Sequence, residues 1–346
     1  MEKKPTIKTI AEIAGVSHVA VSKALRGCSD ISEKMAEKIK EIAKEVGYIP
    51  NAAARNLSLK KTNTIGMIVP EMGNHTSYSD IFNYISAAAA RKGLNVILGS
   101  CNRDIELEKL FCKNMCESRV GVLIVASMSS EVTHIKEICK DIVPVIFIGG
   151  KTGLEQENCI TMDYKHSGKL VVNYFYERGH RDIALFLYYP ENRTITQKLD
   201  GYIETMNDLG LEPRVYWHGN SSDTFNAGSE LVERLINSNE LPTAIWCASD
   251  IMALGVINAL QEHGINVPEE VSVIGHDDLF FSALKSISLT TLSLPKEEIG
   301  LKVVDISIKL MEGKSEGVRR EEDYKRVFNS KLIERNTTIR INAMDS

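Results

Sequence analysis

Apolar residues in the first fifty positions recur at the three-to-four-residue spacing of amphipathic helices. Gly15 interrupts this pattern, and Ser17 and Ser32 stand where the N-caps of two further helices are expected. The positions expected to face inward are Ile10, Ile13 and Ala14, then Val21, Ala24 and Leu25, then Met35, Ile39, Ile42 and Val46. A helix, a tight turn, a second helix and a supporting third helix are the elements of a helix-turn-helix.

Beyond residue 62, short continuous apolar runs alternate with longer helical stretches. Continuous apolar strands joined by helical crossovers predict parallel sheets that are covered on both faces. The runs are TIGMIVP, LNVILGS, VGVLIVAS, VPVIFIGG, CITMDY, DIALFLYY, TAIWCAS and VSVIGHDD. They are numerous enough for two sheets, so the sequence predicts an all-α head and an α/β body of two Rossmann-like lobes.

Charge is distributed unevenly between the head and the body. Twelve Lys and Arg residues against seven Asp and Glu residues give residues 1–62 a net charge of +5. The whole chain carries −5, so the remainder carries −10. A basic head on an acidic body favours a polyanionic partner at one end of the chain.

The second helix of a helix-turn-helix lies in the major groove of DNA. Its outward-facing side chains here, His18, Val19 and Lys23, are candidate base readers. The hydroxyls of Ser17 and Ser22 are better placed for phosphates. His18 has an alternative interpretation as an ordinary surface residue, and Val19 reads a base only if it touches a thymine methyl group. Double-stranded DNA is therefore the expected partner of the head.

Several classes of protein are disfavoured by what the sequence lacks. The N-terminus has no apolar secretion segment, and no stretch reaches the roughly 18 apolar residues of a membrane span. Seven cysteines without paired C-x-x-C spacing suit a reducing compartment, so we expect a cytoplasmic protein with no membrane partner. No G-x-S-x-G, H-E-x-x-H, P-loop or G-x-G-x-x-G motif occurs, so we expect no enzyme, no metal and no cofactor.

Three segments near the N-terminus resemble a known family in their order and spacing. TIKTIAEIAGVSHVAVSKAL, GYIPNAAARNL and TNTIGMIVP are similar to the head and hinge of the lactose-repressor (LacI/GalR) family of bacterial transcription regulators. The resemblance continues through ERGHRDIA, SDIMALGVINAL, VPEEVSVIGHDD and LTTL. It implies a homodimer in which the two Rossmann-like lobes together form the periplasmic-binding-protein type I fold, with three crossovers near residues 163, 293 and 325.

The resemblance also implies the domain boundaries. The helix-turn-helix domain is expected at residues 1–49, and a hinge helix with its linker at residues 50–62. An effector-binding and dimerisation domain is expected at residues 63–346. Its N-lobe is expected at about 63–162 and 294–324, and its C-lobe at about 163–293 and 325–341.

The proline-led segment PNAAARNL, residues 50–57, has good helix propensity but is too short for a stable isolated helix. The resemblance implies that it folds against its dimer mate in the operator's minor groove, with Leu57 wedged between central base pairs. The alternative for Leu57 is packing on its own domain. Asn51 and Ala54 match family contacts to the minor groove or phosphates, and Arg55 is a candidate phosphate partner. The candidate DNA-binding set also contains Lys8, Arg26, Ser32 and Tyr48.

Residues that follow predicted strands are candidates for effector binding, because ligands in open α/β sheets lie beyond the carboxyl ends of strands. Asp277 matches the family's effector-binding aspartate and could accept two sugar hydroxyls. Arg193 and Lys198 follow DIALFLYY, and the family usually has an arginine where Lys198 stands, so the planar fork is missing. Tyr78 and Ser249 complete the set. The alternative for each is a polar residue that meets a helix terminus.

These features together imply a sequence-specific DNA-binding regulator, with a repressor of a carbohydrate-utilisation operon as the expected role. Two copies would bind a pseudo-palindromic operator, controlled by a small effector, a sugar or sugar phosphate, in the cleft between the lobes. Two alternatives stay open. A protein co-regulator could replace the small effector. A solute-binding protein of a transporter would share the lobes, but it would need a secretion signal and would lack a helix-turn-helix.

Overall fold

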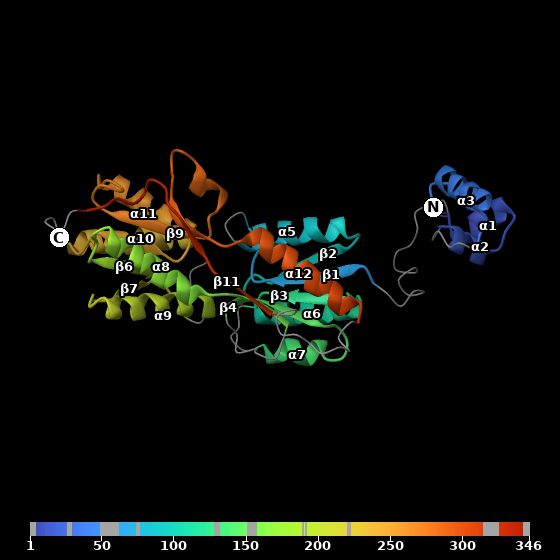
Figure 1. Cartoon of the computed structure of the whole chain (residues 1–346), viewed down its shortest axis with the longest axis horizontal. Helices are drawn as coiled ribbons and strands as arrows, with labels where there is room; N and C mark the ends of the chain where they lie inside the picture. Colours follow the sequence, from blue (N-terminus) through green and yellow to red (C-terminus); the bar gives the residue numbers. More distant parts are fainter. Residues whose placement is uncertain are drawn as a thin grey trace. The chain divides into compact units, whose positions relative to one another are not determined.

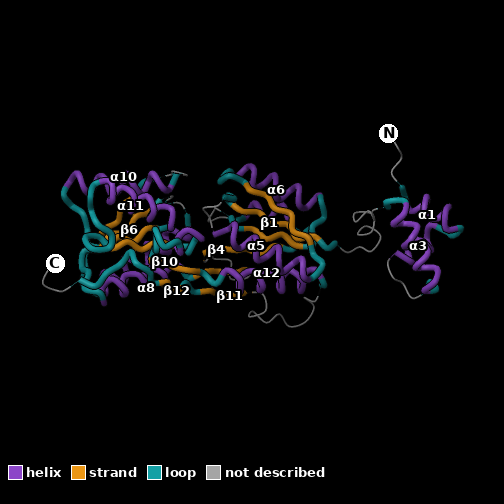
Figure 2. Tube along the Cα trace, turned by 90° about the horizontal axis from the view of Figure 1, so that it is seen from above, coloured by secondary structure: helices purple, strands orange, loops and turns teal. Residues whose placement is uncertain are grey.

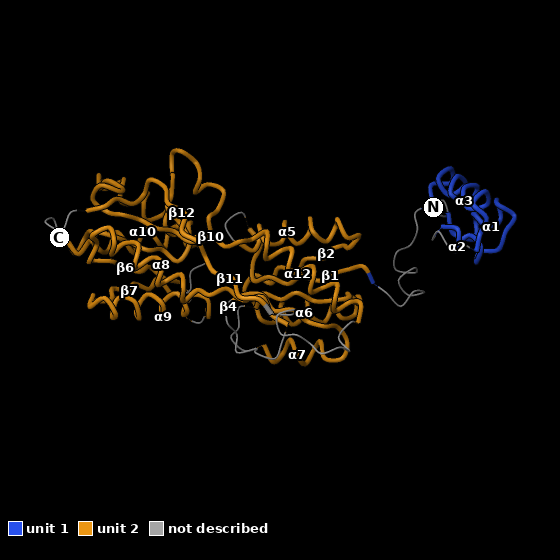
Figure 3. The backbone as a smooth tube through the Cα atoms, in the orientation of Figure 1, with its two compact units in different colours: residues 1–62 blue, residues 63–346 orange. Residues whose placement is uncertain are grey.

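The chain divides into two compact units, Met1–Thr62 and Asn63–Ser346, each with its own core (Figure 3). Among the described residues, no helix combines the length and apolar character that crossing a membrane requires. The computed structural model describes residues 5–25, 30–48, 62–73, 77–127, 132–150, 158–188, 190, 192–219, 223–313 and 325–341.

The first unit contains the three predicted helices α1 (Ile7–Ala14), α2 (His18–Leu25) and α3 (Glu33–Glu45). Gly15 has a left-handed φ of 71° and ends α1. The Ser17 hydroxyl accepts a hydrogen bond from the Ala20 N–H at 3.2 Å, which confirms the expected cap of α2. Ser32 stands at the N-cap position of α3, but its hydroxyl makes no capping hydrogen bond there. The fully buried core side chains are Ile10, Val21, Ala24 and Ile39. The prediction for Ile13 was wrong, because its side chain retains 54% of its accessible surface.

The second unit contains two six-stranded sheets, which confirms the predicted α/β body of two lobes (Figure 1). The first sheet has the order β11-β5-β4-β3-β1-β2, and the second has the order β12-β10-β9-β8-β6-β7. Every pairing is parallel except that of β12 with β10. The strands of the first sheet are β1 (Thr64–Val69), β2 (Asn95–Ser100), β3 (Val122–Val125), β4 (Val145–Gly150), β5 (Asn158–Met162) and β11 (Lys325–Phe328). Those of the second are β6 (Ile183–Leu187), β7 (Arg214–Trp217), β8 (Ala244–Cys247), β9 (Ser272–His276), β10 (Thr290–Ser293) and β12 (Lys331–Ile333).

Helices cover both faces of each sheet (Figures 1 and 2). Because successive strand residues point to opposite faces, Met67 of β1 packs beneath one helix pair and its neighbour Ile68 packs beneath the other. The helices of the first lobe are α5 (Ser77–Arg91) and α12 (Lys296–Met311) on one face, with α6 (Ile105–Glu117) and α7 (Thr133–Cys139) on the other. Those of the second lobe are α10 (Thr224–Ser238) and α11 (Asp250–Glu262), with α8 (Tyr164–Glu177) and α9 (Arg193–Asp208) opposite. A short 3-10 helix, η1 (Phe280–Ala283), precedes β10.

The last crossover between the lobes lies a few residues later than the sequence predicts. The expected C-lobe segment began near residue 325, but β11 pairs with β5 in the first sheet. The physical reason is Phe328, which is buried in the core of the first lobe and holds β11 there. The chain therefore enters the second lobe between Phe328 and β12.

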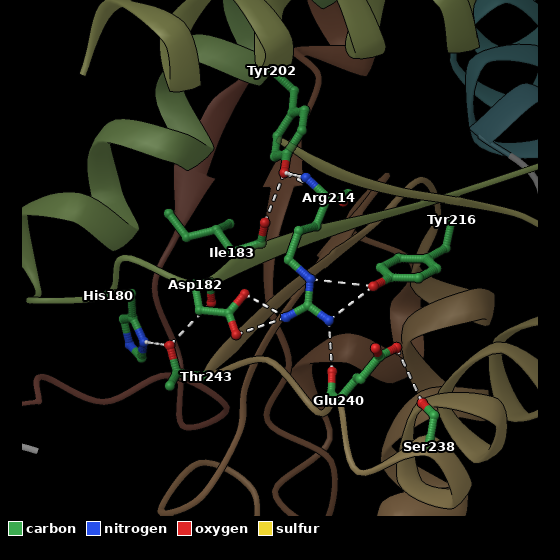
Figure 4. A network of polar contacts seen from close by, with 9 residues as sticks. All are labelled: His180, Asp182, Ile183, Tyr202, Arg214, Tyr216, Ser238, Glu240 and Thr243. Carbon is green, nitrogen blue, oxygen red and sulfur yellow. Dashed lines mark hydrogen bonds and ion pairs between the residues drawn. The ribbon is translucent and has the colours of Figure 1, made fainter. Parts of the chain in front are cut away.

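A network of polar contacts joins the segments at the amino ends of β6 and β7 (Figure 4). It lies at the end of the second lobe opposite the carboxyl ends of these strands. Nη1 of Arg214 donates to both carboxylate oxygens of Asp182, at 2.6 and 2.7 Å, and Nε and Nη2 both donate to the Tyr216 hydroxyl. The buried imidazole of His180 contacts the Thr243 hydroxyl and the Ile339 carbonyl, both at 3.1 Å. Both ring nitrogens of His180 are thus satisfied.

Glycines let α8 and α9 approach closely in the second lobe. A Cβ atom on Gly201 would lie 2.0 Å from the Lys165 carbonyl oxygen, and one on Gly168 would lie 2.4 Å from the Tyr202 amide nitrogen. Both contacts are with backbone atoms, which cannot move aside as a flexible side chain could. The two helices can keep this spacing only with glycine at both positions.

We expect Gly201→Ala to lower the free energy of unfolding by about 2–3 kcal/mol, because the added methyl group must push α8 and α9 apart. Gly73→Ala is the control, since a Cβ atom there would meet nothing within 4 Å. Urea denaturation of the two variants and the native protein measures the difference. Equal stability of Gly201→Ala and Gly73→Ala would show that the helices are not held at this distance.

Candidate functional site

A cavity of about 650 Å³ lies between the two lobes, beyond the carboxyl ends of strands of both sheets. This is the expected place for a ligand in open α/β sheets, and the volume is in the usual range for small-molecule sites. The first lobe contributes Glu71, Met72, Gly73, Ser77, Tyr78, Asn102 and Arg103. The second lobe contributes Tyr164, Tyr188, Asn192, Thr194, Ile195, Lys198, Asp223, Thr224, Phe225, Ser249, Ile251, Leu254 and Asp277.

Asp277 follows β9 and lines the cavity, as the sequence predicts. Its φ of 111° and the φ of 48° at Asp278 are unusual for non-glycine residues, so a tight turn directs these two side chains. Burial raises the pKa of the Asp277 carboxyl, while Lys198, Lys296 and a hydrogen bond from Ser77 favour its charged form. Because Ser77 begins α5 in the other lobe, this hydrogen bond joins the two walls of the cleft.

Lys198 of α9 also lines the cavity, and its side chain is buried. The ammonium donates to the carbonyl oxygen of Ala248 at 2.7 Å and lies 5.3 Å from the centre of the Tyr164 ring. Burial lowers the Lys198 pKa to about 8, although the carboxyls of Asp277 and Asp250 oppose that shift.

Of two further predicted residues, Ser249 lines the cavity and Arg193 does not. Ser249 lines the cavity and also caps α11, because its hydroxyl accepts a hydrogen bond from the Met252 N–H at 3.3 Å. Arg193 does not line the cavity, although it is the first residue of α9. The face of α9 that meets the cavity carries Thr194, Ile195 and Lys198, and helical spacing turns Arg193 away from that face.

The cavity contains aromatic side chains from both lobes. Tyr78, in the first turn of α5, was predicted, and burial raises its pKa to about 12. Tyr164 and Tyr188 were not predicted, and burial raises their pKa values as well. Tyr188 directly follows β6, so the position after a strand was a usable signal for it.

The ion pair between Arg103 and Glu71, which line the cavity from the first lobe, was also not predicted. Nε of Arg103 donates to one carboxylate oxygen of Glu71 at 2.7 Å, and a second guanidinium nitrogen donates to the other oxygen at 3.0 Å. Glu71 follows β1 and Arg103 follows β2, which are neighbours in the sheet. Reading every strand end for paired charges would have found them.

Behind the cavity, Asp250 is fully buried and accepts hydrogen bonds from the Leu279 N–H at 2.8 Å and the Ser282 hydroxyl at 2.7 Å. The Thr291 hydroxyl contacts its other oxygen at 2.5 Å. Burial and the nearby Asp277 carboxyl raise the Asp250 pKa to about 7, against these three hydrogen bonds. The carboxyl group therefore ties the start of α11 to the segment that follows β9.

In the head, the candidate DNA-binding residues that the structure describes lie on α2 and on the segments next to it. His18 and Val19 are exposed, and Val19 retains 50% of its accessible surface. Ser22 and Lys23 are partly exposed, and Lys23 forms an ion pair with Asp30. The exposed residue Ser17 caps α2, and the exposed residues Lys8 and Ser32 lie on α1 and at the start of α3, whereas Tyr48 packs partly against the core. Arg26, Asn51, Ala54, Arg55 and Leu57 lie outside the described residues.

No group of three or more His, Cys, Asp or Glu side chains in the described part of the chain is arranged to hold a metal ion. The six cysteines that the structure describes are buried, and none of them forms a disulfide bond. What the cavity offers is hydrogen bonding and aromatic contact between two lobes. This arrangement suits reversible ligand binding.

The three-helix head and the two-lobed body define a protein of the lac-repressor fold, and comparisons with known proteins agree. The model of the lacI family of bacterial regulatory proteins matches residues 6–51, and that of a periplasmic binding protein-like domain matches residues 172–338. Catabolite control protein A of Priestia megaterium is 31% identical over 309 residues, covering 88% of this chain and 92% of that protein. The transcriptional repressor CytR of Escherichia coli K12 is 29% identical over 317 residues, covering 91% and 92% of the two chains.

A solved structure of the lac repressor dimer bound to operator and the anti-inducer ONPF superposes with a TM-score of 0.86 at 26% identity. That match covers 97% of this chain and 100% of the other. The chain therefore belongs to the LacI family of bacterial regulatory proteins, which confirms the resemblance. It is a DNA-binding transcriptional regulator with a periplasmic-binding-protein-like body, so the solute-binding alternative is set aside.

The buried ammonium of Lys198 predicts a specific pH dependence of stability. Because its pKa is about 8 in the folded protein and 10.5 in the unfolded chain, the unfolded chain binds more protons between these values, and stability rises with pH there. From about pH 7.5 to about pH 9.5, we expect native stability to rise by about 2 kcal/mol relative to Lys198→Met. Urea denaturation across this range measures both proteins.

Lys169→Met, which changes an exposed lysine of α8, is the control and should retain the native pH dependence. If the stability curves of the native protein and Lys198→Met run parallel, the ammonium is not buried in the way described.

Proposed function

We propose that this protein is a dimeric repressor whose affinity for operator DNA is set by a small, uncharged, hydroxyl-rich effector in the interlobe cavity. The observation that carries the proposal is the cavity itself, where Asp277 of one lobe and Ser77 of the other share a hydrogen bond. A ligand that engages Asp277 can therefore alter the contact between the lobes. The proposal assigns no catalytic activity, and it places the protein in the cytoplasm with its operator.

The head is proposed to read one half-site per subunit. His18, Val19 and Lys23 of α2 would face the base edges, while Lys8, Ser17, Ser22, Ser32 and Tyr48 would contact the sugar-phosphate backbone. Arg26, Asn51, Ala54, Arg55 and Leu57 are proposed contacts as well, the last in the minor groove. Two-fold symmetry then predicts a pseudo-palindromic operator. The lac repressor dimer bound to operator, which this fold matches, supports this arrangement.

An uncharged effector is favoured over a sugar phosphate by the partners of the two cavity cations. Arg103 is bound through two nitrogens to Glu71, and Lys198 donates to the Ala248 carbonyl oxygen close to Asp277. A phosphate group would have to displace a carboxylate from Arg103 or add a negative charge beside Asp277. Hydroxyl groups avoid both costs, because they can donate to a carboxylate and accept from an ammonium. Related structures contain cellobiose or D-xylulofuranose.

Contacts of Lys296 support a path by which a structural change at the cavity would be transmitted to α5 and α12. Lys296 begins α12, is buried, and donates to the Asp80 carboxylate of α5 at 2.5 Å and to the Asp278 carbonyl oxygen at 3.3 Å. Arg335 holds the Asp278 carboxylate at 2.7 Å. A change at the turn after β9 would therefore reach the first turns of both helices. In the proposed dimer, α5 and α12 form part of the subunit interface, so such a shift would change the spacing of the two heads.

Lys23→Ala tests whether α2 contacts the bases of the operator. Removing a base-reading ammonium should weaken binding to an operator selected from random DNA by about tenfold or more, and weaken binding to random duplex much less. The Lys23 ion pair with Asp30 is solvent-exposed and therefore weak enough to exchange for DNA. Fluorescence anisotropy at several salt concentrations measures both affinities.

Lys40→Ala serves as the control, because Lys40 is an exposed lysine of α3 outside the candidate set. Equal losses on the operator and on random duplex for Lys23→Ala would mean that Lys23 contacts only phosphates.

Lys296→Met tests whether Lys296 transmits the effect of ligand binding from the cavity to α5 and α12. We expect this variant to bind sugar within a few-fold of the native affinity, because Lys296 does not line the cavity. The effect of sugar on operator affinity should fall by about fivefold or more. Lys92→Met, which changes an exposed lysine after α5, should keep the native response. A native-sized response in Lys296→Met would exclude this route.

A further inference from the structure

His276, the last residue of β9, is a buried polar residue whose ring has no hydrogen-bond partner among the described residues. Its side chain has no accessible surface, and neither ring nitrogen has a hydrogen-bond partner within the described part of the chain. Buried polar groups are nearly always hydrogen-bonded, because losing water without gaining a partner is costly. The imidazole therefore needs an explanation that packing does not supply.

A second group in the same condition lies beside it. The indole N–H of Trp246, on the neighbouring strand β8, is buried and has no partner among the described residues. Trp246 lies opposite Ile274, two positions before His276, so both side chains point to the same face of the sheet. Their ring centres are 6.3 Å apart. Three unsatisfied nitrogens thus gather at one place.

Only a thin layer of side chains separates this place from the cavity. The ring of Tyr164 lines the cavity, and its centre lies 5.7 Å from that of His276. Lys198 also lines the cavity, 5.3 Å from the Tyr164 ring. Burial, reinforced by the charges of Lys198 and Lys296, holds the pKa of His276 well below its usual value. The imidazole is therefore neutral, with one nitrogen that donates and one that accepts.

His180 is a second buried histidine in the same lobe, away from the cavity, and its ring has hydrogen-bond partners (Figure 4). It is equally inaccessible, at 1% exposure, but its nitrogens contact the Thr243 hydroxyl and the Ile339 carbonyl. The fold thus satisfies a histidine at the amino ends of the strands and leaves one unsatisfied at their carboxyl ends, beneath the ligand cavity.

We propose that His276 is a specificity-determining residue of the effector site, whose imidazole, together with the indole N–H of Trp246, hydrogen-bonds a hydroxyl group of the ligand. The Tyr164 side chain turns aside to admit that hydroxyl. A hydroxyl group fits because it can donate to the imidazole and accept from the indole at once. The inference rests on the proposed function and deepens it, since it assigns part of the effector's recognition to two residues outside the open cavity.

His276→Phe and His180→Phe form a matched pair of tests. Phenylalanine replaces an unsatisfied polar ring with an apolar ring of similar size in the first case, so His276→Phe should raise the Tm of the ligand-free protein. In the second case it removes two hydrogen bonds, so His180→Phe should lower the Tm. Differential scanning fluorimetry measures both. A lower Tm for His276→Phe than for the native protein would overturn the proposal, because the imidazole would then have a partner within the fold.

Ligand binding provides the second measurement. The probes are cellobiose, D-xylulose, D-glucose, D-galactose and D-ribose, with a phosphate ester of glucose as the anionic comparison. For the neutral sugar that binds the native protein most tightly, His276→Phe should raise Kd by about tenfold or more, while His180→Phe should leave it unchanged. His276→Asn, which keeps a donor and an acceptor, should restore part of the affinity.

The outcomes separate this inference from the proposed function. If a neutral sugar binds the native protein and His276→Phe with equal Kd, the role of His276 is wrong and the proposed function stands. If only the phosphate ester binds, or if no probe binds the native protein, the proposed effector class fails and the inference fails with it.

Discussion

The turn formed by Asp277 and Asp278 contacts both lobes of the body, and the contacts of the cavity described above depend on how that turn is held. Both residues have positive φ values, and the Asp277 N–H donates to the Leu292 carbonyl oxygen at 2.8 Å. One carboxylate then faces the cavity and Ser77, while the other is held by Arg335. Such strained backbone persists only where its surroundings fix it, and it is common at ligand sites. Here it connects ligand recognition with contact between the lobes.

The partners of the cavity cations support the proposed response to an uncharged ligand. Arg103 is bound to Glu71, and Lys198 donates to the Ala248 carbonyl oxygen. The cations are thus already engaged, and a ligand gains little by bringing a negative charge of its own. Hydroxyl groups can join these networks without breaking an ion pair, and they suit the proposed role of His276, whose ring nitrogens have no partner among the described residues. Under the proposed function, the ligand shifts the protein toward whichever arrangement of the lobes it binds more tightly.

Sequence reasoning reached the fold because local and global signals agree in this chain. Continuous apolar runs become strands buried on both faces, and Asp277 lines the cavity because a strand ends beside it. Directions of individual side chains were harder to obtain. Arg193 and Lys198 share one helix, but only the three-dimensional placement of α9 decides which of them meets the cavity. The unsatisfied nitrogens of His276 could not be predicted, because satisfaction depends on every neighbour at once.

The central claim is that ligand binding in the cavity changes the structure of the first lobe through this turn. Hydrogen–deuterium exchange of the body, with and without a saturating neutral sugar, tests this claim most directly. The expected result is changed exchange at the first turns of α5 and α12, around Asp80 and Lys296, in addition to the cavity walls. Exchange that changes only in the second lobe, around Lys198 and Asp250, with α5 and α12 unaffected, would contradict it.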